Sequence, residues 1–178
     1  AIARATVIEN LDFYTQEDYV PLIEALNDPS PQVRFQALLK FRNIPPQDRL
    51  TIAIRHMQDT TKMVRIAAAQ LVIGLDENQL NNTDKQQDLQ SKNELETMLF
   101  TNADFSNGRM QLGDYYLQLN NISKAIEHYK VALEKDSLLL PVYSNLATAY
   151  SMVNDLENAT KTLDTWILLD TSSSRPYY

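Results

Sequence analysis

The C-terminal third of the chain repeats itself with a period of about 34 residues. A shift by that period places apolar residues on apolar ones and small residues on small ones. The matching pairs are Leu112 and Leu146, Gly113 and Ala147, Tyr116 and Tyr150, Ala125 and Ala159, and Asp136 and Asp170. A fixed period of this length is typical of stacked helical hairpins, because a single hairpin cannot bury its apolar face alone. The period therefore predicts an array of helices whose exposed surface holds partners.

The small residues of the repeat indicate where its two helices cross. Gly113 falls inside an expected helix, where glycine costs about 1 kcal/mol relative to alanine. We therefore expect a second helix, with Ala125 as its small residue, to pass too close to Gly113 for a larger side chain. Replacement of Gly113 or Ala147 by leucine should cost about 1–3 kcal/mol through overpacking, and a change at the neighbouring Asp114 should cost much less.

This arrangement of small and aromatic residues resembles the tetratricopeptide repeat. The positions that match are Leu112, Gly113, Tyr116, Ala125, Tyr129 and Ala132 in the first copy, and Tyr143, Leu146, Ala147, Tyr150 and Ala159 in the second. In that family the first helix of each hairpin lines a concave groove that binds peptides. The residues that the resemblance assigns to this groove are Asn107, Met110, Gln111, Asp114 and Leu117 from the first repeat, and Ser144, Asn145, Thr148 and Met152 from the second. Such a groove suits an extended peptide or a helix.

A second, shorter period runs through the N-terminal part of the chain. The residues Asp28, Val33, Arg34 and Ala37 recur one period later as Asp59, Val64, Arg65 and Ala68. This pattern resembles HEAT-like repeats, in which an aspartate precedes a Val-Arg pair. In that family the aspartate and the arginine link neighbouring repeats through hydrogen bonds, so the resemblance makes these charged residues structural. Ser30 is expected to cap the helix that begins at Pro31.

Apolar residues follow helical spacing almost throughout, and no segment alternates with the period of a strand. The expected helices cover residues 3–11, 17–26, 31–41, 46–57, 61–75, 92–101, 106–119, 122–135, 141–153 and 156–169. The predicted fold is all-α, a right-handed α-solenoid of helical hairpins. Its expected parts are HEAT-like repeats over 1–75, a polar linker over 76–92, and tetratricopeptide repeats over 93–178, with a partial lead-in helix, two full repeats and a truncated third. Tyr177 lies one further period after Tyr143, which predicts that the chain is part of a longer protein.

Charge and composition argue against several kinds of partner and site. The net charge is −7, and residues 76–178 carry 15 acids against 8 bases. An acidic surface argues against nucleic acid, whose phosphates need a basic track. No stretch is long and apolar enough for membrane insertion. The sequence has no cysteine, which excludes disulfides and thiolate metal sites within it.

The sequence holds no recognisable catalytic or cofactor-binding constellation. His56 and His128 are the only histidines, and neither has a second histidine or a cysteine at metal-ligand spacing. The serines at 172–174 lack the glycine-rich elbow of a hydrolase. Gly108 and Gly113 are not followed by the lysine of a phosphate loop. We therefore expect a non-catalytic chain with no metal or cofactor site, whose partner is a protein or a peptide.

The order of the two repeat types resembles the C-terminal region of multihaem c-type cytochromes that carry a repeat tail. The stretches that carry this resemblance are 3–6, 28–37 and 123–129. The resemblance implies a scaffold attached to an upstream haem domain of the same chain, and export to the periplasm. Two alternatives stay open, namely a stand-alone helical-repeat adaptor, cytoplasmic or exported, and an enzyme built on HEAT-like repeats, such as the DNA glycosylases of that architecture. The balance of eight acids and eight bases in residues 1–75 argues against the enzyme.

Overall fold

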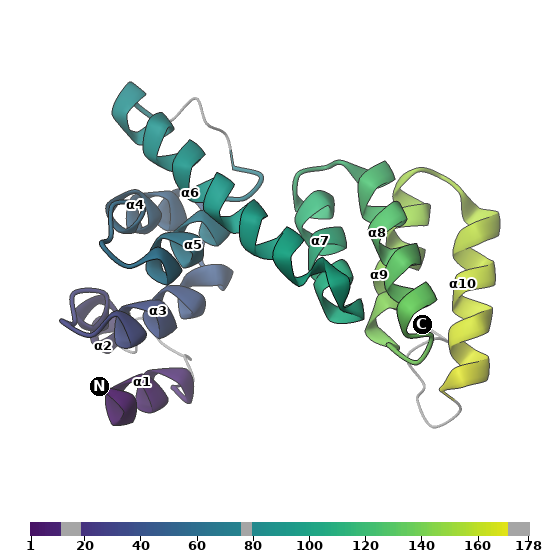
Figure 1. Cartoon of the computed structure of the whole chain (residues 1–178), viewed down its shortest axis with the longest axis horizontal. Coiled ribbons are helices and arrows are strands. Elements are labelled where there is room, and N and C mark those ends of the chain that lie inside the picture. The colour runs from purple at the N-terminus through teal and green to yellow at the C-terminus, as the bar shows by residue number, and fades with distance from the viewer. Residues whose placement is uncertain (12–18, 76–79, 171–178) are drawn as a thin grey trace. The chain divides into compact units, whose positions relative to one another are not determined.

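The computed structural model describes residues 1–11, 19–75 and 80–170, and within them the regular structure is entirely helical, as predicted (Figure 1). The described chain forms two compact units that divide between Leu95 and Glu96. The helices of the first unit are α1 (Ile2–Glu9), α2 (Tyr19–Ala25), α3 (Pro31–Lys40), α4 (Pro46–His56), α5 (Lys62–Leu71) and most of α6 (Asn82–Thr101). Those of the second are α7 (Ser106–Gln118), α8 (Ile122–Lys135), α9 (Pro141–Met152) and α10 (Leu156–Leu169).

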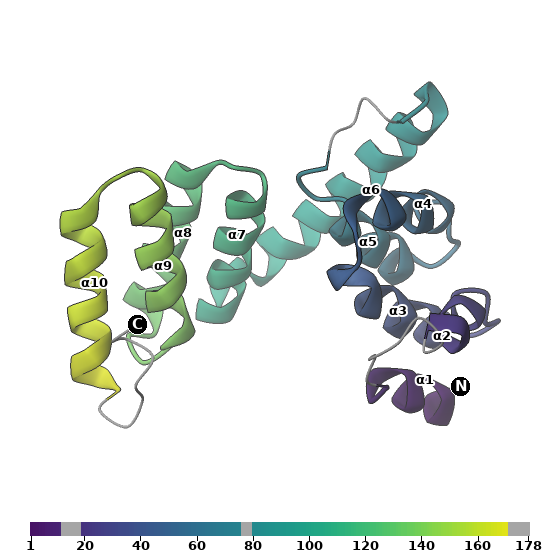
Figure 2. The same ribbon diagram turned by 180° about the vertical axis from the view of Figure 1, so that it is seen from behind.

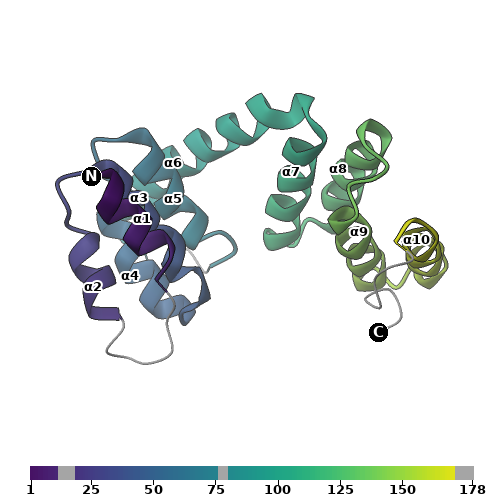
Figure 3. The ribbon, with the colours of Figure 1, turned by 90° about the horizontal axis from the view of Figure 1, so that it is seen from below.

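Helix α3 is the centre of the first unit. Helices α1, α2 and α5 pack against it, and α4 packs against α5 (Figure 3). The side chains between them are fully or almost fully buried and include Leu22, Val33, Leu38, Phe41, Val64 and Leu71. Pro31 and Pro46 occupy the first turns of α3 and α4, where the missing N–H of proline costs no hydrogen bond. Helical spacing of apolar residues and proline punctuation thus produce the expected helix starts.

The second unit consists of four helices that pack in chain order, α7 on α8, α8 on α9 and α9 on α10 (Figure 2). The turns of its two hairpins have the same geometry. Asn120 and Asn154, one repeat period apart, adopt positive φ angles of 57° and 60°, a conformation that asparagine tolerates better than most residues. Asn121 and Asp155 follow them and cap α8 and α10, each accepting a backbone N–H three residues on. The period of the sequence is therefore also a period of the backbone.

Helix α6 differs from the sequence-based expectation. It begins at Asn82 rather than at residue 92, so it runs through most of the segment expected to be a solvated linker. Asn81 caps it by accepting the backbone N–H groups of Thr83 and Asp84, both at 2.9 Å. The prediction was wrong because it relied on apolar residues, which are scarce in this stretch, whereas its Gln and Lys residues are good helix formers. Tertiary contacts also hold it, since Ser91 is completely buried.

Candidate functional site

The nine residues predicted to bind a peptide all lie on α7 and α9, and we call them together the α7–α9 surface. Asn107, Gln111, Thr148 and Met152 are exposed. The other five are partly buried, namely Met110, Asp114, Leu117, Ser144 and Asn145. The two helices contact each other directly, although α8 lies between them in the chain. The predicted residues therefore come from adjacent helices.

Asp114 is a structural residue in this arrangement rather than a free acid. Its Oδ1 accepts a hydrogen bond from the Tyr129 hydroxyl at 2.7 Å and another from the Asn145 side-chain amide at 2.9 Å. Tyr129 belongs to α8 and is fully buried, and Asn145 belongs to α9. Asp114 thus joins three helices. The expectation that a change at Asp114 costs much less than one at Gly113 has to be corrected, because the carboxylate satisfies a buried hydroxyl.

Burial raises the pKa of Asp114, although the hydrogen bonds from Tyr129 and Asn145 favour its charged form. Burial also raises the pKa of Tyr129, and the hydrogen bond to Asp114 raises it further. The hydroxyl is therefore a hydrogen-bond donor to Asp114 at neutral pH. A carboxyl group whose pKa is higher in the folded state stabilises the fold at low pH. That stability is lost as the pH rises from the ordinary aspartate value through the folded pKa.

We expect the substitutions Asp114→Ala and Asp114→Asn to behave differently. Alanine leaves the buried Tyr129 hydroxyl without its acceptor and should cost about 1–3 kcal/mol in unfolding free energy. Asparagine keeps an acceptor oxygen and removes the ionisation, so its stability relative to wild type should improve as the pH rises from below 3.8 to neutral. Urea unfolding at several pH values, followed by the fluorescence of Trp166, measures both effects. Equal losses for the two variants at every pH would contradict this role.

Gly113 on α7 lies against the Tyr129 ring of α8. A Cβ atom at this position would lie 2.5 Å from Cδ1 of the Tyr129 ring. The ring has no room to withdraw, because Tyr129 is fully buried and its hydroxyl is held by Asp114. Ala125 on α8 is also completely buried. The predicted close crossing at Gly113 is therefore confirmed.

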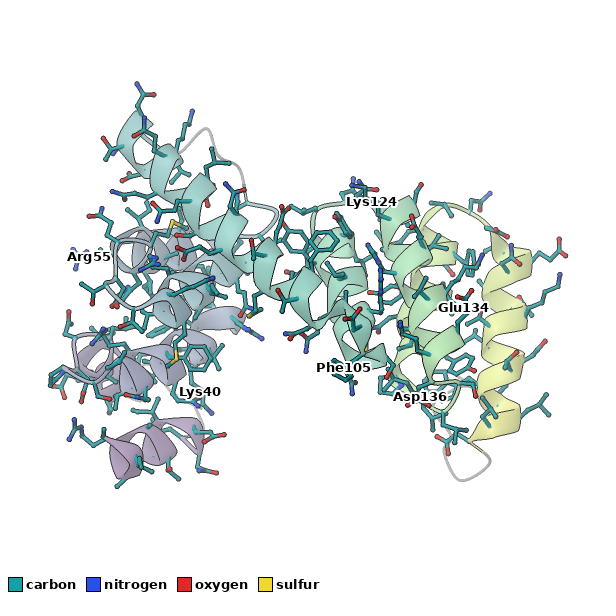
Figure 4. The ribbon with its side chains drawn as sticks, in the orientation of Figure 1. Lys40, Arg55, Phe105, Lys124, Glu134 and Asp136 are labelled. Atoms are coloured by element: carbon teal, nitrogen blue, oxygen red, sulfur yellow. The ribbon has the colours of Figure 1, made fainter. Side chains whose placement is uncertain are left out.

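A second cluster, which the sequence did not predict, also joins α7 to α8. Arg109 donates through Nε to the Ala103 carbonyl at 2.8 Å and brings Nη1 within 3.3 Å of His128 Nδ1. The His128 ring stacks on Tyr116 with centroids 5.2 Å apart. Lys124 lies at the start of α8 (Figure 4). Its ammonium group is 4.7 Å from the centre of the Tyr116 ring. Burial, and then the positive charge of Arg109, lowers the pKa of His128. The imidazole is therefore neutral at pH 7 and accepts from Arg109.

The charged residues of the N-terminal period form a ladder of ion pairs in the first unit. Arg34 binds both carboxylate oxygens of Asp59, at 2.7 and 2.9 Å, and donates Nη1 to the Asp28 carbonyl at 2.7 Å. One repeat later, Arg65 donates to the Asp59 carbonyl at 2.7 Å and binds Glu94. Arg4 binds Asp28 at the other end. The predicted structural role of these residues is thus confirmed.

Glu94 is the member of the ladder that the sequence period could not find. The same shift that carries Asp28 to Asp59 carries Asp59 to Gln90, and Glu94 lies one helical turn further along α6. Its carboxylate is 2.7 Å from Arg65 Nη2, and this hydrogen bond holds the pKa of Glu94 below its usual value. A helix places side chains four residues apart on the same face, so Glu94 takes the place of an aspartate. The ladder therefore extends beyond the predicted end of the HEAT-like part at residue 75.

Asp28 and Asp59 of the ladder also stabilise the turns that lead into α3 and α5. Asp28 Oδ1 accepts the backbone N–H of Ser30, and Asp59 Oδ1 accepts that of Thr61, both at 2.8 Å. The Ser30 hydroxyl instead donates to Gln32 at 2.7 Å and makes no capping bond. The expected cap by the Ser30 side chain was therefore wrong. The carboxylate two residues earlier binds the backbone of the turn in its place.

His56, considered above as a metal ligand, instead has both ring nitrogens next to backbone carbonyls of the first unit. Its Nδ1 lies 2.7 Å from the Ile52 carbonyl, and its Nε2 lies 3.1 Å from the Leu26 carbonyl. Neither ring nitrogen faces open space. Across residues 1–11, 19–75 and 80–170 no group of three His, Cys, Asp or Glu side chains is placed to hold a metal ion. The serines at 172–174 lie outside the described residues.

In the described part of the chain, no helix is long and apolar enough to cross a membrane. Within the ladder, charged groups of different helices bind one another. Around Asp114, hydrogen bonds likewise join side chains of different helices. No family model matches the chain, and no curated protein or solved structure matches it either.

Proposed function

We propose that the chain is a non-catalytic protein-interaction scaffold, a right-handed α-solenoid of HEAT-like and then tetratricopeptide repeats, that binds a peptide or a helix on the α7–α9 surface. The observation that supports it best is the bridge from Asn145 on α9 to Asp114 on α7. It keeps the first helices of two successive hairpins side by side. Their exposed residues are thereby available to one ligand that lies across both helices.

The chemistry of this surface favours a neutral ligand segment. Asp114, its one acid, uses Oδ1 within the protein. The exposed groups that remain are the side-chain amides of Asn107 and Gln111. The Thr148 hydroxyl donates to the Ser144 carbonyl at 2.9 Å and can still accept a hydrogen bond from a ligand. Amides can both donate to and accept from a peptide backbone. Met110 and Met152 supply flexible apolar contacts that adapt to different side chains.

Charge placed on the exposed residues tests this proposal without disturbing the fold. The variant Gln111→Lys plus Thr148→Lys changes two exposed positions, whereas Asp114 and Asn145 stay intact. Its matched control, Ser123→Lys plus Thr160→Lys, puts the same charges on exposed positions of α8 and α10. A protein partner recovered by crosslinking to the wild-type chain, then purified, should bind the first variant at least about tenfold more weakly and the control unchanged. Undiminished binding to the first variant would reject the α7–α9 surface as the site.

We further propose, from the order of the repeats, that the parent protein is an exported multihaem redox protein whose haem domain lies upstream. The alternative remains a helical-repeat adaptor with no redox chemistry. Cys-x-x-Cys-His motifs in the sequence before Ala1, and the absorbance of c-type haem in the purified full-length protein, would support the first. A full-length protein without such motifs would reject the redox proposal and favour the adaptor.

A further inference from the structure

The fold uses only one of the two carboxylate oxygens of Asp114. Both hydrogen bonds to this group, from the Tyr129 hydroxyl and the Asn145 side-chain amide, go to Oδ1. Within the described residues Oδ2 accepts no hydrogen bond, and it reaches solvent. The two donors come from α8 and α9 and hold the group in one orientation. The α7–α9 surface therefore carries one open carboxylate oxygen at a fixed place.

The charge of Asp114 has no counter-charge in the part of the chain that the structure describes. Burial is the strongest influence on the pKa of Asp114 and raises it, and the influences that lower it are the two hydrogen bonds, with no positive side chain among them. The acids of the ladder differ, since Asp28, Asp59 and Glu94 each bind an arginine. Burial disfavours a charged carboxylate, and a nearby cation offsets that cost. A ligand that brings a cation to Oδ2 thus gains an attraction that the protein itself leaves unused.

The neighbours of Asp114 on α7 suit the stem of a long cationic side chain. Met110 lies four residues before it and Leu117 three residues after it, so both share its face of the helix, and both are partly buried. Apolar side chains pack against the methylene groups of such a stem while its charged end reaches an acceptor. Because Oδ1 already has two donors, the carboxylate offers one point of contact. That suits the compact ammonium group of lysine better than the planar fork of arginine, which binds both oxygens.

We propose that Asp114 selects the ligand of the α7–α9 surface, and that this ligand is a protein segment with a lysine whose ammonium group binds Oδ2. The lysine is the one charged anchor of a segment that is otherwise neutral. Helices on either side hold the site, since residues 102–104 pack against α7 and α10 packs against α9. This inference rests on the proposed function, because it names the kind of ligand that the same surface binds.

Selection from random peptides displayed on phage tests the preference. The full chain is the target, at physiological ionic strength, where attraction between distant charges is screened. Peptides recovered with the wild-type chain should share a lysine that arginine rarely replaces. Asp114→Asn keeps an acceptor for Tyr129 and removes the charge, so peptides recovered with this variant should lack the shared lysine.

The outcomes of this selection separate the inference from the proposed function. Peptides that show no preference for lysine, yet lose binding to the variant Gln111→Lys plus Thr148→Lys, would overturn the inference and leave the proposed function standing. A shared lysine that persists in the selection with Asp114→Asn would overturn it as well. Recovery of no peptide would reject both.

A synthetic copy of one recovered lysine peptide makes the test quantitative. Asp114→Asn should weaken its binding about tenfold or more. Asp164→Asn is the matched control, because it removes the same charge from an exposed position of α10, and it should leave binding unchanged. Equal losses in the two variants would show general attraction to an acidic chain and overturn the proposal.

A measurement on the wild-type chain needs no variant. An ammonium group at Oδ2 favours the charged carboxylate, so the bound peptide should lower the pKa of Asp114. NMR of the Asp114 carboxyl carbon during a pH titration, with and without the peptide, measures this shift. An unchanged pKa in the presence of saturating peptide would place the lysine elsewhere and overturn the proposal.

Discussion

Gly108→Ala adds one methyl group, and we expect it to lower the unfolding free energy of the second unit more than a methyl group added anywhere else in that unit. A Cβ atom at Gly108 would overlap the carbonyl oxygen of Asn102 and lie 3.1 Å from the backbone nitrogen of Ala103. This backbone cannot move away cheaply, because the Asn102 carbonyl accepts the N–H of Phe105 and the Ala103 carbonyl accepts from Arg109. Overpacking against fixed backbone should cost about 3 kcal/mol or more.

Urea unfolding followed by fluorescence measures this loss, since Trp166 is the only tryptophan and is buried in α10 of the same unit. The control is Asn107→Ala, at an exposed position next to Gly108, which should stay within about 0.5 kcal/mol of wild type. Similar midpoints for the two variants would show that the first turn of α7 does not approach residues 102–103 this closely.

Arg34→Met is expected to have the largest effect in the first unit. Methionine keeps much of the apolar stem but removes the guanidinium group. The substitution leaves Asp59 Oδ2 and the Asp28 carbonyl without the donor that Arg34 supplies, and Asp59 Oδ1 keeps only the Thr61 N–H. The Asp59 side chain is 9% exposed. The loss of hydrogen bonds to a charged and largely buried group should cost about 2–3 kcal/mol. Circular dichroism at the helix band during urea unfolding measures it.

Arg4→Met is the matched control, because Arg4 makes the same bidentate contact while it is mostly exposed. Its effect should be much smaller. Burial opposes the charge of Asp59, but the hydrogen bonds from Arg34 and the Thr61 N–H outweigh it and hold the pKa of Asp59 below its usual value. The contribution of Arg34 should therefore be lost as the pH falls below 3.8 and Asp59 is protonated. Equal effects at both arginines would mean that burial does not strengthen the ladder.

Most helices could be predicted from the sequence because local chemistry marks their starts. Proline occupies the first turns of α3, α4 and α9, and turn residues with left-handed backbone precede the caps of α8 and α10. The second half of α6 was predicted, whereas residues 82–91 were missed because Leu89 is their one apolar residue. Polar contacts form in this part of the helix, such as the ion pair of the buried Asp88 with Lys92 at 2.7 Å. A pattern of apolar residues cannot detect a helix of that kind.

The helices that carry the nine candidate residues could be predicted from the sequence, whereas the contacts of the individual side chains could not. The period of the C-terminal repeats placed the nine residues of the α7–α9 surface on two neighbouring helices. The period gave no warning that Asp114 is bonded to Tyr129 and Asn145, since those partners are 15 and 31 residues away. The contact of Arg109 with His128 was missed for the same reason. Side-chain networks between helices depend on how closely the helices pack. The period of the sequence does not give that distance.

The 20 residues of α6 have a consequence for any attempt to divide the protein into fragments. Glu94, which completes the ladder, and Glu96, which accepts a hydrogen bond from Tyr115, lie on either side of the boundary between the units within one continuous helix. A fragment that stopped at residue 95 would leave Glu94 in a fraying last turn, and one that started at residue 96 would expose four unsatisfied N–H groups beside Glu96. Fragments that fold autonomously would have to overlap, each retaining residues 82–101, and melting of this single helix would remove a support from both units at once.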